Sequence, residues 1–391
     1  MRRSKHTVSS KHVEACATSL LCDKIKLVGR GTKCVAEVLV RIVLFAASRV
    51  TSIEDACLRL KNVPKGDATR AALARGLPRL PTLTRRVNDA LQALIPGRAF
   101  RKSKRGQRLA IDLTLIPYHG KPFRKVREIY RGEAKSGTTH FHAYATCYLV
   151  HHGRRFTVAA LYVQKGTPLE KVVSELLEIA KNAGIRPRLL LLDRGFFQAS
   201  VVSYLQESGT PFLMPMTMRG RKPTHPKGPS GTYIFTVKKR SGWSQYTWTG
   251  RNKKEVTVSV CMARVSSSRG NGKVTLAYAY GGFQPCSTKW VCTTYRERFG
   301  IESSYRQMNQ ARIYTCTRNP LLRFFYVAVA LILRNVWVWF HYLHLSAPRR
   351  GGREIRLFRM RFRTMLHWIL HVIEALYGFD DQAESHVPST P

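Results

Sequence analysis

The chain of 391 residues contains 66 Lys or Arg and 23 Asp or Glu, so its formal net charge is +43 at pH 7. Because Lys and Arg gain affinity by releasing counterions, this excess indicates a polyanionic partner, with nucleic acid as the first candidate and an anionic membrane surface as the second. The length suits two or three domains, and a hydrophobic content of 44% favours a packed globular enzyme over a ribosomal or packaging protein.

The cysteines and the apolar runs exclude further classes of protein. The nine cysteines include no C-x-x-C pair, which argues against a zinc ribbon or a disulfide scaffold and favours a reducing compartment. No apolar stretch follows the N-terminus, so no secretory signal is expected. The longest apolar run, residues 324–333, is too short to span a bilayer of roughly 30 Å. We therefore expect a buried helix there and no membrane partner.

Residues 1–97 are predicted to form a helical, basic N-terminal domain that binds DNA. Apolar residues recur at helical spacing in residues 33–50, and Ser52 begins a capping pattern for a second helix. Two more helices are expected at residues 67–77 and 82–95. Short basic helices with tight turns can include a helix-turn-helix DNA reader, but a bundle that only supports the next domain fits the pattern as well.

A basic linker at residues 98–108 leads into residues 105–216, the first part of a predicted α/β core. Strands are expected at residues 109–116, 140–150, 155–163, 189–192 and 211–216, with helices at 167–183 and 199–208. This order predicts a mixed sheet with at least one parallel crossover.

Residues 219–283 are predicted to form an all-β insertion in that core. Apolar and polar residues alternate at 233–237 and 255–262, and Gly-containing turns separate the segments. Trp243, Tyr246 and Trp248 are interleaved with cations here. Such aromatic residues either stack on bases or face a small core, and the pattern fits both.

The core is expected to resume at residues 288–345, with a helix at 290–309 and a long apolar helix from 320 to 344. Residues 346–391 are predicted to form a basic C-terminal helix and tail. If 290–309 is one helix, a single stripe of about 100° carries a carboxylate among phosphate-reading groups. The stripe consists of Tyr295, Arg298, Glu302, Tyr305, Arg306 and Asn309. A surface ion pair between Arg298 and Glu302, four residues apart, is the alternative interpretation.

Two more carboxylates lie in unusual places. Asp112 interrupts a wholly apolar strand, and Asp193 directly follows another. A buried carboxylate needs a compensating partner, so each is either a salt bridge with an arginine or a metal ligand. Together with Glu302 they offer three hard oxygen ligands. Carboxylates suit Mg²⁺ or Mn²⁺, and two such ions about 3.5–4 Å apart can promote phosphodiester chemistry.

Three motifs together resemble the DDE transposases of insertion sequences, in the group with a Y-x-x-R-x-x-x-E signature and a β-rich insertion. The motifs are I-D-L-T around Asp112, L-L-D-R-G-F around Asp193, and Tyr295, Arg298 and Glu302 in the third. The resemblance implies a ribonuclease H-like fold. It also implies that Asp112, Asp193 and Glu302 bind two metal ions and catalyse DNA cleavage and strand transfer.

The same resemblance implies the partners. Tyr295 and Arg298 are expected to hold transposon-end DNA, with Arg306 as a further DNA-binding residue. The partners are double-stranded DNA, as terminal inverted repeats and target DNA, and a second copy of the chain in a homodimer. A prokaryotic, cytoplasmic, nucleoid-associated protein is expected.

One position departs from the family pattern. Asn309 stands seven residues after Glu302, where the family usually has a Lys, so Arg306 or Arg312 takes over its role or this copy is weakened. Two other functions therefore stay open. One is a stand-alone metal-dependent DNA nuclease, and the other is a catalytically inactive, transposase-derived DNA-binding protein.

Overall fold

The structure, a computed structural model, describes residues 7–97, 106–151, 154–250, 253–266, 272–349, 352–354 and 356–382. Most of the expected linker at 98–108 lies outside these residues. The chain divides into two compact units, one of Met1–Leu94 with Arg306–Pro391 and the other of Ile95–Tyr305. Each unit is described by itself below.

The first unit is mainly helical. In it α11 packs against α1 and α2, and α10 packs against α5 and α2. Its helices are α1 (Ser10–Ile25), α2 (Ala36–Arg49), α3 (Ile53–Arg59), α4 (Gly66–Gly76), α5 (Leu80–Ala93), α10 (Pro320–Phe340) and α11 (Phe362–Tyr377), and a short hairpin consists of β10 (Ala347–Arg349) and β11 (Gly352–Glu354). The helical N-terminal segment agrees with the prediction.

Helix α10 is the core of this unit. Among the described helices, Pro320–Leu345 is long and apolar enough to cross a membrane, but 94% of its apolar window is buried inside the structure. The predicted buried helix is confirmed. Because α10 is apolar on all sides, it packs among the N-terminal helices. Residues 306–391, which include α10, form one compact unit with residues 1–94, and the predicted core segment at 288–345 stays a prediction.

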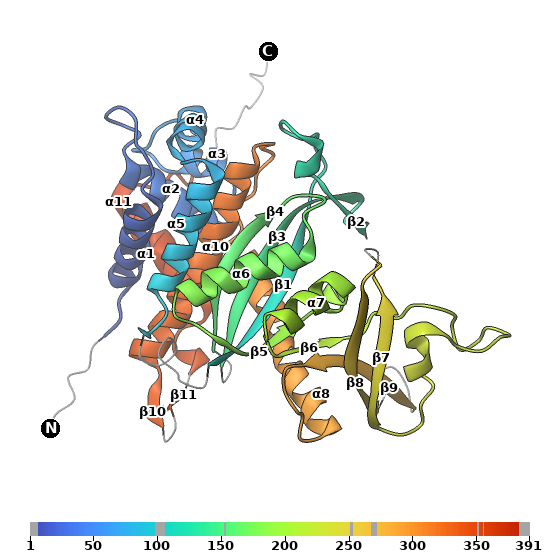
Figure 1. The fold of residues 1–391 in the computed structure, drawn as a ribbon. Helices are drawn as coiled ribbons and strands as arrows, with labels where there is room; N and C mark the ends of the chain where they lie inside the picture. Colours follow the sequence, from blue (N-terminus) through green and yellow to red (C-terminus); the bar gives the residue numbers. More distant parts are fainter. Residues whose placement is uncertain are drawn as a thin grey trace, which may run out of the picture. The chain divides into compact units, whose positions relative to one another are not determined.

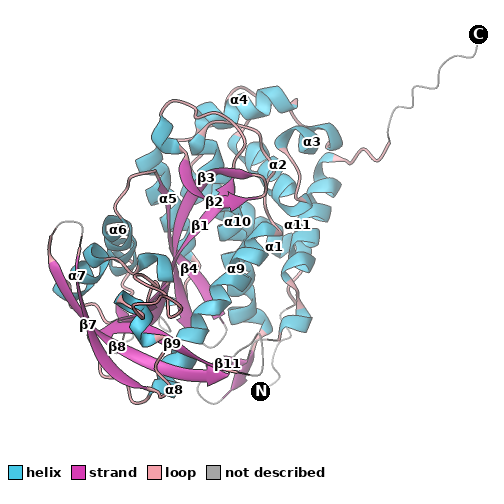
Figure 2. Cartoon of the chain, turned by 90° about the vertical axis from the view of Figure 1, so that its right-hand side faces the viewer, coloured by secondary structure: helices cyan, strands magenta, loops and turns pink. Residues whose placement is uncertain are grey.

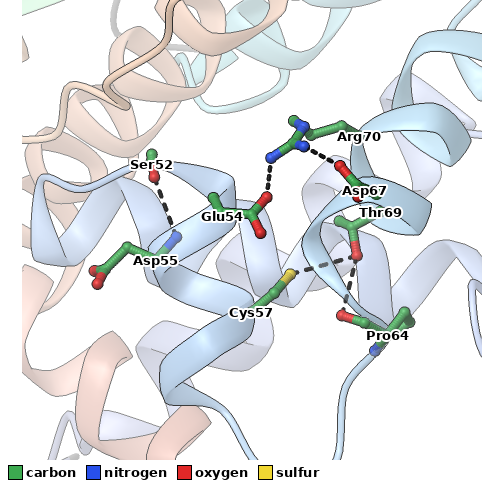
Figure 3. Close-up of polar contacts among 8 residues, drawn as sticks. All are labelled: Ser52, Glu54, Asp55, Cys57, Pro64, Asp67, Thr69 and Arg70. Carbon is green, nitrogen blue, oxygen red and sulfur yellow. Dashed lines mark hydrogen bonds and ion pairs between the residues drawn. The ribbon is translucent and has the colours of Figure 1, made fainter. Parts of the chain in front are cut away.

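Helices α3 and α4 are joined by a compact set of polar contacts (Figure 3). The hydroxyl of Ser52 accepts a hydrogen bond from the Asp55 N–H at 3.1 Å, so the predicted cap of this helix is confirmed. Arg70 of α4 forms ion pairs with Glu54 of α3 and with Asp67. The Arg70–Glu54 pair links α4 to α3, whereas Asp67 belongs to α4 itself. A helix-turn-helix function for this segment stays a prediction.

The second unit is built on one mixed sheet. Within the described residues the hydrogen-bonded order is β2-β3-β1-β5-β6-β9-β8-β7. Strand β4 also pairs with β3, farther along the edge that β2 occupies and opposite the edge that pairs with β1. Strands β1, β5 and β6 are parallel, whereas β3 and β4 are antiparallel to their neighbours. The strands are β1 (Gln107–Pro117), β2 (Tyr130–Lys135), β3 (Thr138–His151), β4 (Arg154–Val163), β5 (Pro187–Leu192), β6 (Phe212–Pro215), β7 (Gly242–Thr249), β8 (Glu255–Ser266) and β9 (Lys273–Gly281). The predicted mixed α/β core is confirmed.

Helices cover both sides of this sheet. Helices α6 (Leu169–Asn182) and α7 (Ala199–Glu207) lie side by side on one side, as Figure 1 shows. The segment of α8 (Thr288–Arg296) and α9 (Gly300–Asn309) runs along the other side (Figure 2). The central strands of the sheet are therefore covered by helix on both sides, whereas the edge strands β2 and β7 are partly exposed.

The insertion continues the core sheet. Strand β9 pairs antiparallel with β6, so β7, β8 and β9 extend the sheet at one end (Figure 2). The strand expected at 233–237 is wrong, because a 3₁₀-helix occupies Gly231–Phe235. The two buried residues of that helix, Thr232 and Phe235, are three apart, which is the repeat of a 3₁₀-helix rather than of a strand.

The junction of β6 and β9 leaves no room for a side chain at Gly281. A Cβ atom there would lie 2.7 Å from a ring carbon of Phe212, which is fully buried. Overpacking of this kind costs roughly 1–3 kcal/mol, so we expect Gly281→Ala to lower the melting temperature. Gly242→Ala, in the edge strand β7, is the matched control because its nearest neighbouring atom is 3.8 Å away. Equal melting temperatures by calorimetry would contradict tight packing at this junction.

Candidate active site

The register of two parallel strands brings Asp112 and Asp193 together. Strand β1 pairs with β5 so that Ile111 lies opposite Leu192. Asp112 follows Ile111 within β1, and Asp193 is the first residue after β5. The expected adjacency of these two strands is confirmed. The two acids, 81 positions apart in the sequence, are therefore neighbours at the carboxyl end of β5.

Strand alternation sets the side of the sheet on which these acids lie. Ala110 and Leu191 belong to the apolar cluster that packs against α8. Since side chains two residues apart in a strand share a face, Asp112 and Asp193 continue the same face. The acids therefore border the layer formed by α8 and the turn that follows it.

The segment 290–309 is not one helix. Helix α8 ends at Arg296, a 3₁₀ turn spans Glu297–Phe299, and α9 begins at Gly300. The expected single stripe is wrong, because the 3₁₀ turn changes the angular position of every residue after it. In this turn the Glu297 carboxylate accepts from the guanidinium of Arg108, with both oxygens 2.6 Å from Nη1.

A side chain at position 300, where α9 begins, would require Arg155 to move. The guanidinium of Arg155 lies where a Cβ atom of residue 300 would be, at 1.6 Å from its Cζ. Arg155 also donates to the carbonyl of Glu297 at 3.4 Å, and burial lowers the pKa of Arg155. Sequence reasoning missed Arg108 and Arg155. A cation at the start of the buried strand β4 was the available signal for Arg155.

Arg298 lies between the two aspartates. One guanidinium nitrogen, Nη2, is 3.2 Å from an oxygen of Asp112 and 3.2 Å from an oxygen of Asp193. The Arg298 side chain is only 5% exposed, against 13% for Asp112 and 46% for Asp193. The Leu113 N–H donates to the same Asp112 oxygen at 2.9 Å. The salt-bridge alternative for the two acids is thus realised through one shared arginine.

Tyr295 is buried beside this bridge. Its ring lies 5.2 Å from that of Tyr278 and 5.9 Å from the Arg298 guanidinium. Burial raises the pKa of the Tyr295 hydroxyl above its usual value. In this conformation Tyr295 and Arg298 are each 4% exposed, so neither is displayed on a surface for DNA as the stripe implied. Their DNA contacts stay predictions that need a change of conformation.

Helix α9 is held against β3 by Tyr305. Its hydroxyl lies 2.5 Å from the Thr146 hydroxyl, and its ring meets Tyr148 edge-on at 5.8 Å. Thr146 is the register partner of Asp112 in the β1–β3 ladder. Burial, followed by the neighbouring Tyr148 and Asp112, raises the pKa of Tyr305 well above its usual value. The first turns of α9 therefore run past the strand position that carries Asp112.

The remaining predicted residues also lie on α9. Glu302 is three residues before Tyr305 on α9, and its side chain lies outside the described residues. Arg306 and Asn309 are exposed on the same helix. Tyr305, expected among phosphate-reading groups, instead contacts the sheet.

The described residues bring two possible metal ligands together at one cation. No cluster of three or more His, Cys, Asp or Glu side chains able to hold a metal is found among the described residues. Asp112 and Asp193 nevertheless converge on one positive charge, the guanidinium of Arg298. Two hard carboxylates gathered around a cation are a donor set that fits Mg²⁺ or Mn²⁺. A third donor would have to come from α9.

A cavity of about 480 Å³ adjoins the carboxylate of Asp193. Asp193 and Arg298 line one side of it, and Tyr278, Tyr295 and Phe299 contribute aromatic surface. Sequence reasoning missed this cavity, because it is lined by β6, β9 and the α8–α9 turn, which are distant in sequence. The carboxylate of Asp193 is thus reachable from solvent.

The Tyr305–Thr146 contact predicts a stability effect. Tyr305→Phe removes the hydroxyl and leaves the ring in place, so we expect a loss of about 1 kcal/mol in the free energy of unfolding. That loss corresponds to roughly 2–4 °C in melting temperature for a unit of this size. Tyr314→Phe, at a side chain that is 56% exposed, is the control and should change nothing. An unchanged melting temperature for Tyr305→Phe would show that this contact does not hold α9.

Comparison with known proteins identifies the family. The sequence profile described as "Transposase DDE domain" matches residues 103–335, which is more than half of the chain. No curated protein matches the sequence.

Among solved structures, the chain is similar to a piggyBac transposase, solved by cryo-EM as a synaptic complex with hairpin DNA. The similarity covers 96% of this chain and 82% of that chain, with 11% sequence identity and a TM-score of 0.54. At this identity the likeness concerns the fold, and it confirms the predicted ribonuclease H-like class. The sequence match and the fold agree, and the chain belongs to the DDE transposase family.

Proposed function

We propose that this transposase cleaves transposon ends and joins them to target DNA by two-metal phosphoryl transfer at Asp112, Asp193 and Glu302. The observation that carries the proposal is the convergence of Asp112 and Asp193 on a single guanidinium nitrogen. A structural ion pair needs only one carboxylate for each arginine. Two carboxylates that face one cation are an arrangement suited to divalent cations, and Asp193 also borders an open cavity.

The proposed division of labour follows from the contacts. Asp112 and Asp193 would hold the ions together with Glu302 from α9. Bound Mg²⁺ or Mn²⁺ would supply Lewis-acid polarisation of the phosphate and a more acidic water. The Leu113 N–H donates to the Asp112 oxygen that faces Arg298, so this hydrogen bond orients the carboxylate at the proposed site. Arg298 keeps the two carboxylates together before ions bind.

Double-stranded DNA is the proposed partner, as terminal inverted repeats and as target. The net charge of +43 supports it, because no other feature of the chain explains so many cations. The piggyBac neighbour is described as a synaptic complex with hairpin DNA, which supports two ends held in one assembly. For the same reason we propose that the chain forms a homodimer on DNA. We also propose that the protein is prokaryotic and lies in the cytoplasm, at the nucleoid.

Asn309 favours one other candidate. The exposed amide of Asn309 carries no charge, whereas a Lys at this position would offer a positive charge to a phosphate. The second proposal is therefore an inactive, transposase-derived DNA-binding protein. Tight DNA binding without any cleavage would support it. Mg²⁺-dependent cutting without end specificity would instead support a stand-alone nuclease.

The first prediction concerns the two aspartates. Asp112→Asn and Asp193→Asn each remove a charged metal ligand with little change in shape, so end cleavage should fall at least 1,000-fold, roughly 4 kcal/mol in barrier height. DNA binding should persist, because the cations of the surface are unchanged. The measurement uses the DNA that flanks the gene, with Mg²⁺, in a cleavage gel and in a mobility-shift assay.

The control for this experiment is Asp89→Asn, an exposed acid of α5 that pairs only with Arg85 four residues before it. It should cleave as wild type does. Full activity of Asp193→Asn would remove that residue from the catalytic set.

The second prediction concerns Arg298 and metal affinity. If its guanidinium competes with the ions for Asp112 and Asp193, Arg298→Gln should bind Mn²⁺ at least tenfold more tightly than wild type. The variant should also be less stable without metal, because two neighbouring carboxylates lose their shared counter-charge. Mn²⁺ should then raise its melting temperature more than that of wild type.

Calorimetric titration with Mn²⁺ and thermal unfolding measure both effects without relying on DNA cleavage. Arg296→Gln, two residues away in the sequence, removes the same charge from the end of α8 and serves as the control. Weaker Mn²⁺ binding by Arg298→Gln than by Arg296→Gln would contradict competition.

A further inference from the structure

A basic loop lies between β1 and β2. We use the name basic loop for residues 119–127, H-G-K-P-F-R-K-V-R. It carries four Lys or Arg and no acid, and all four cations are exposed. Val126 is 72% exposed and Phe123 41% exposed at its surface. The cations are Lys121, Arg124, Lys125 and Arg127.

A buried carboxylate fixes the shape of this loop. Glu128 is 5% exposed, and its Oε2 accepts from the backbone N–H of Phe123 at 2.8 Å and of Arg124 at 3.1 Å. A carboxylate that accepts two backbone N–H groups in this way stabilises one backbone path. The cations therefore stand on an ordered loop.

Three further contacts hold the loop to its surroundings. The Tyr118 hydroxyl donates to the Lys121 carbonyl at 2.7 Å, and the Lys165 N–H donates to the Arg127 carbonyl at 2.8 Å. The Tyr162 hydroxyl donates to the carbonyl of Glu128 at 2.8 Å. All of these contacts use backbone atoms of residues 121–128. The side chains of the cations are thus displayed while the backbone is held.

The position of the loop relates it to the carboxylates. Strand β1 continues from Asp112 to its end at Pro117, and the loop follows it, projecting from the sheet in Figure 1. Six steps of about 3.3 Å each, from Asp112 to Tyr118, place the residue before the loop roughly 20 Å from Asp112. That length corresponds to about six base pairs, at about 3.4 Å per step of one strand.

We propose that the basic loop docks on the phosphate backbone of duplex DNA about six base pairs from the scissile phosphate. The inference rests on the proposed function and adds a binding surface to it. Four ordered cations without an acid select a polyanion. A duplex is the polyanion that is long and stiff enough to reach both the loop and the carboxylates, whereas an anionic membrane meets only the loop.

The test compares two variants that remove the same charge. Lys125→Gln/Arg127→Gln changes the loop, and Lys171→Gln/Lys181→Gln changes exposed lysines of α6. Both are made in the Asp193→Asn background, so binding is measured without cleavage. The ligand is a 40-base-pair duplex of the gene's flanking DNA, titrated at several salt concentrations.

The loop variant should lower the slope of log K against log salt by about 2, because each phosphate contact contributes roughly 0.9. At about 0.1 M salt its affinity should fall roughly 10- to 100-fold by the same relation. Glu128→Gln, which keeps every loop cation but weakens the anchor, should lie between wild type and the loop variant. Equal slopes for the loop variant and the α6 variant would overturn the proposal.

Hydroxyl-radical footprinting gives the position. After the cleavage site is mapped with wild type and Mg²⁺, the loop variant should lose protection about six base pairs from the scissile phosphate. Loss of vesicle binding on phosphatidylserine liposomes with unchanged DNA binding would instead assign the loop to a membrane and overturn the proposal. If wild type cuts nothing but the loop variant still loses salt slope, the proposed function fails and the loop stays assigned to DNA.

Discussion

The shared salt bridge of Arg298 with Asp112 and Asp193 is the contact on which the site depends. Asp112 is 13% exposed, so its charge needs a partner in a region of reduced dielectric. One guanidinium supplies that partner to both acids. The net charge of the three groups is nevertheless −1, so the bridge compensates the carboxylates only in part. A divalent cation would compensate them more fully, which makes the bridge replaceable.

The backbone positions this bridge from three directions. The parallel register of β1 and β5 places the acids side by side, and the 3₁₀ turn after α8 places Arg298 above them. The turn is itself held by Arg108 on Glu297 and by Arg155 against Gly300. Arginines thus hold the α8–α9 segment to the sheet at each step. Because the chain has few acids, Glu297 is one of the few carboxylates with which these arginines can form an ion pair.

Much of the fold and part of the site followed from the sequence. Asp112 interrupts an apolar run within β1 and Asp193 directly follows the leucine run of β5, and this pattern correctly predicted both strands. The break at residues 297–299 did not follow, because the apolar spacing of 290–309 is compatible with a continuous helix, and Gly300 is explained only by the distant Arg155. The burial of Arg298 and Tyr295 depends on the same tertiary contacts. The grouping of α10 with the N-terminal helices has no local signal at all.

Charge distribution explains why an arginine suits this place. The formal net charge of the chain, +43, attracts DNA, but two bare carboxylates at the proposed reactive centre would repel the approaching phosphate. With Arg298 between them, the local charge falls to about that of one acid, so a phosphate can approach before metal is bound. Burial keeps the guanidinium from pairing with that phosphate itself, since its side chain is only 5% exposed. The bridge therefore lowers repulsion toward DNA without forming a competing DNA contact in this conformation.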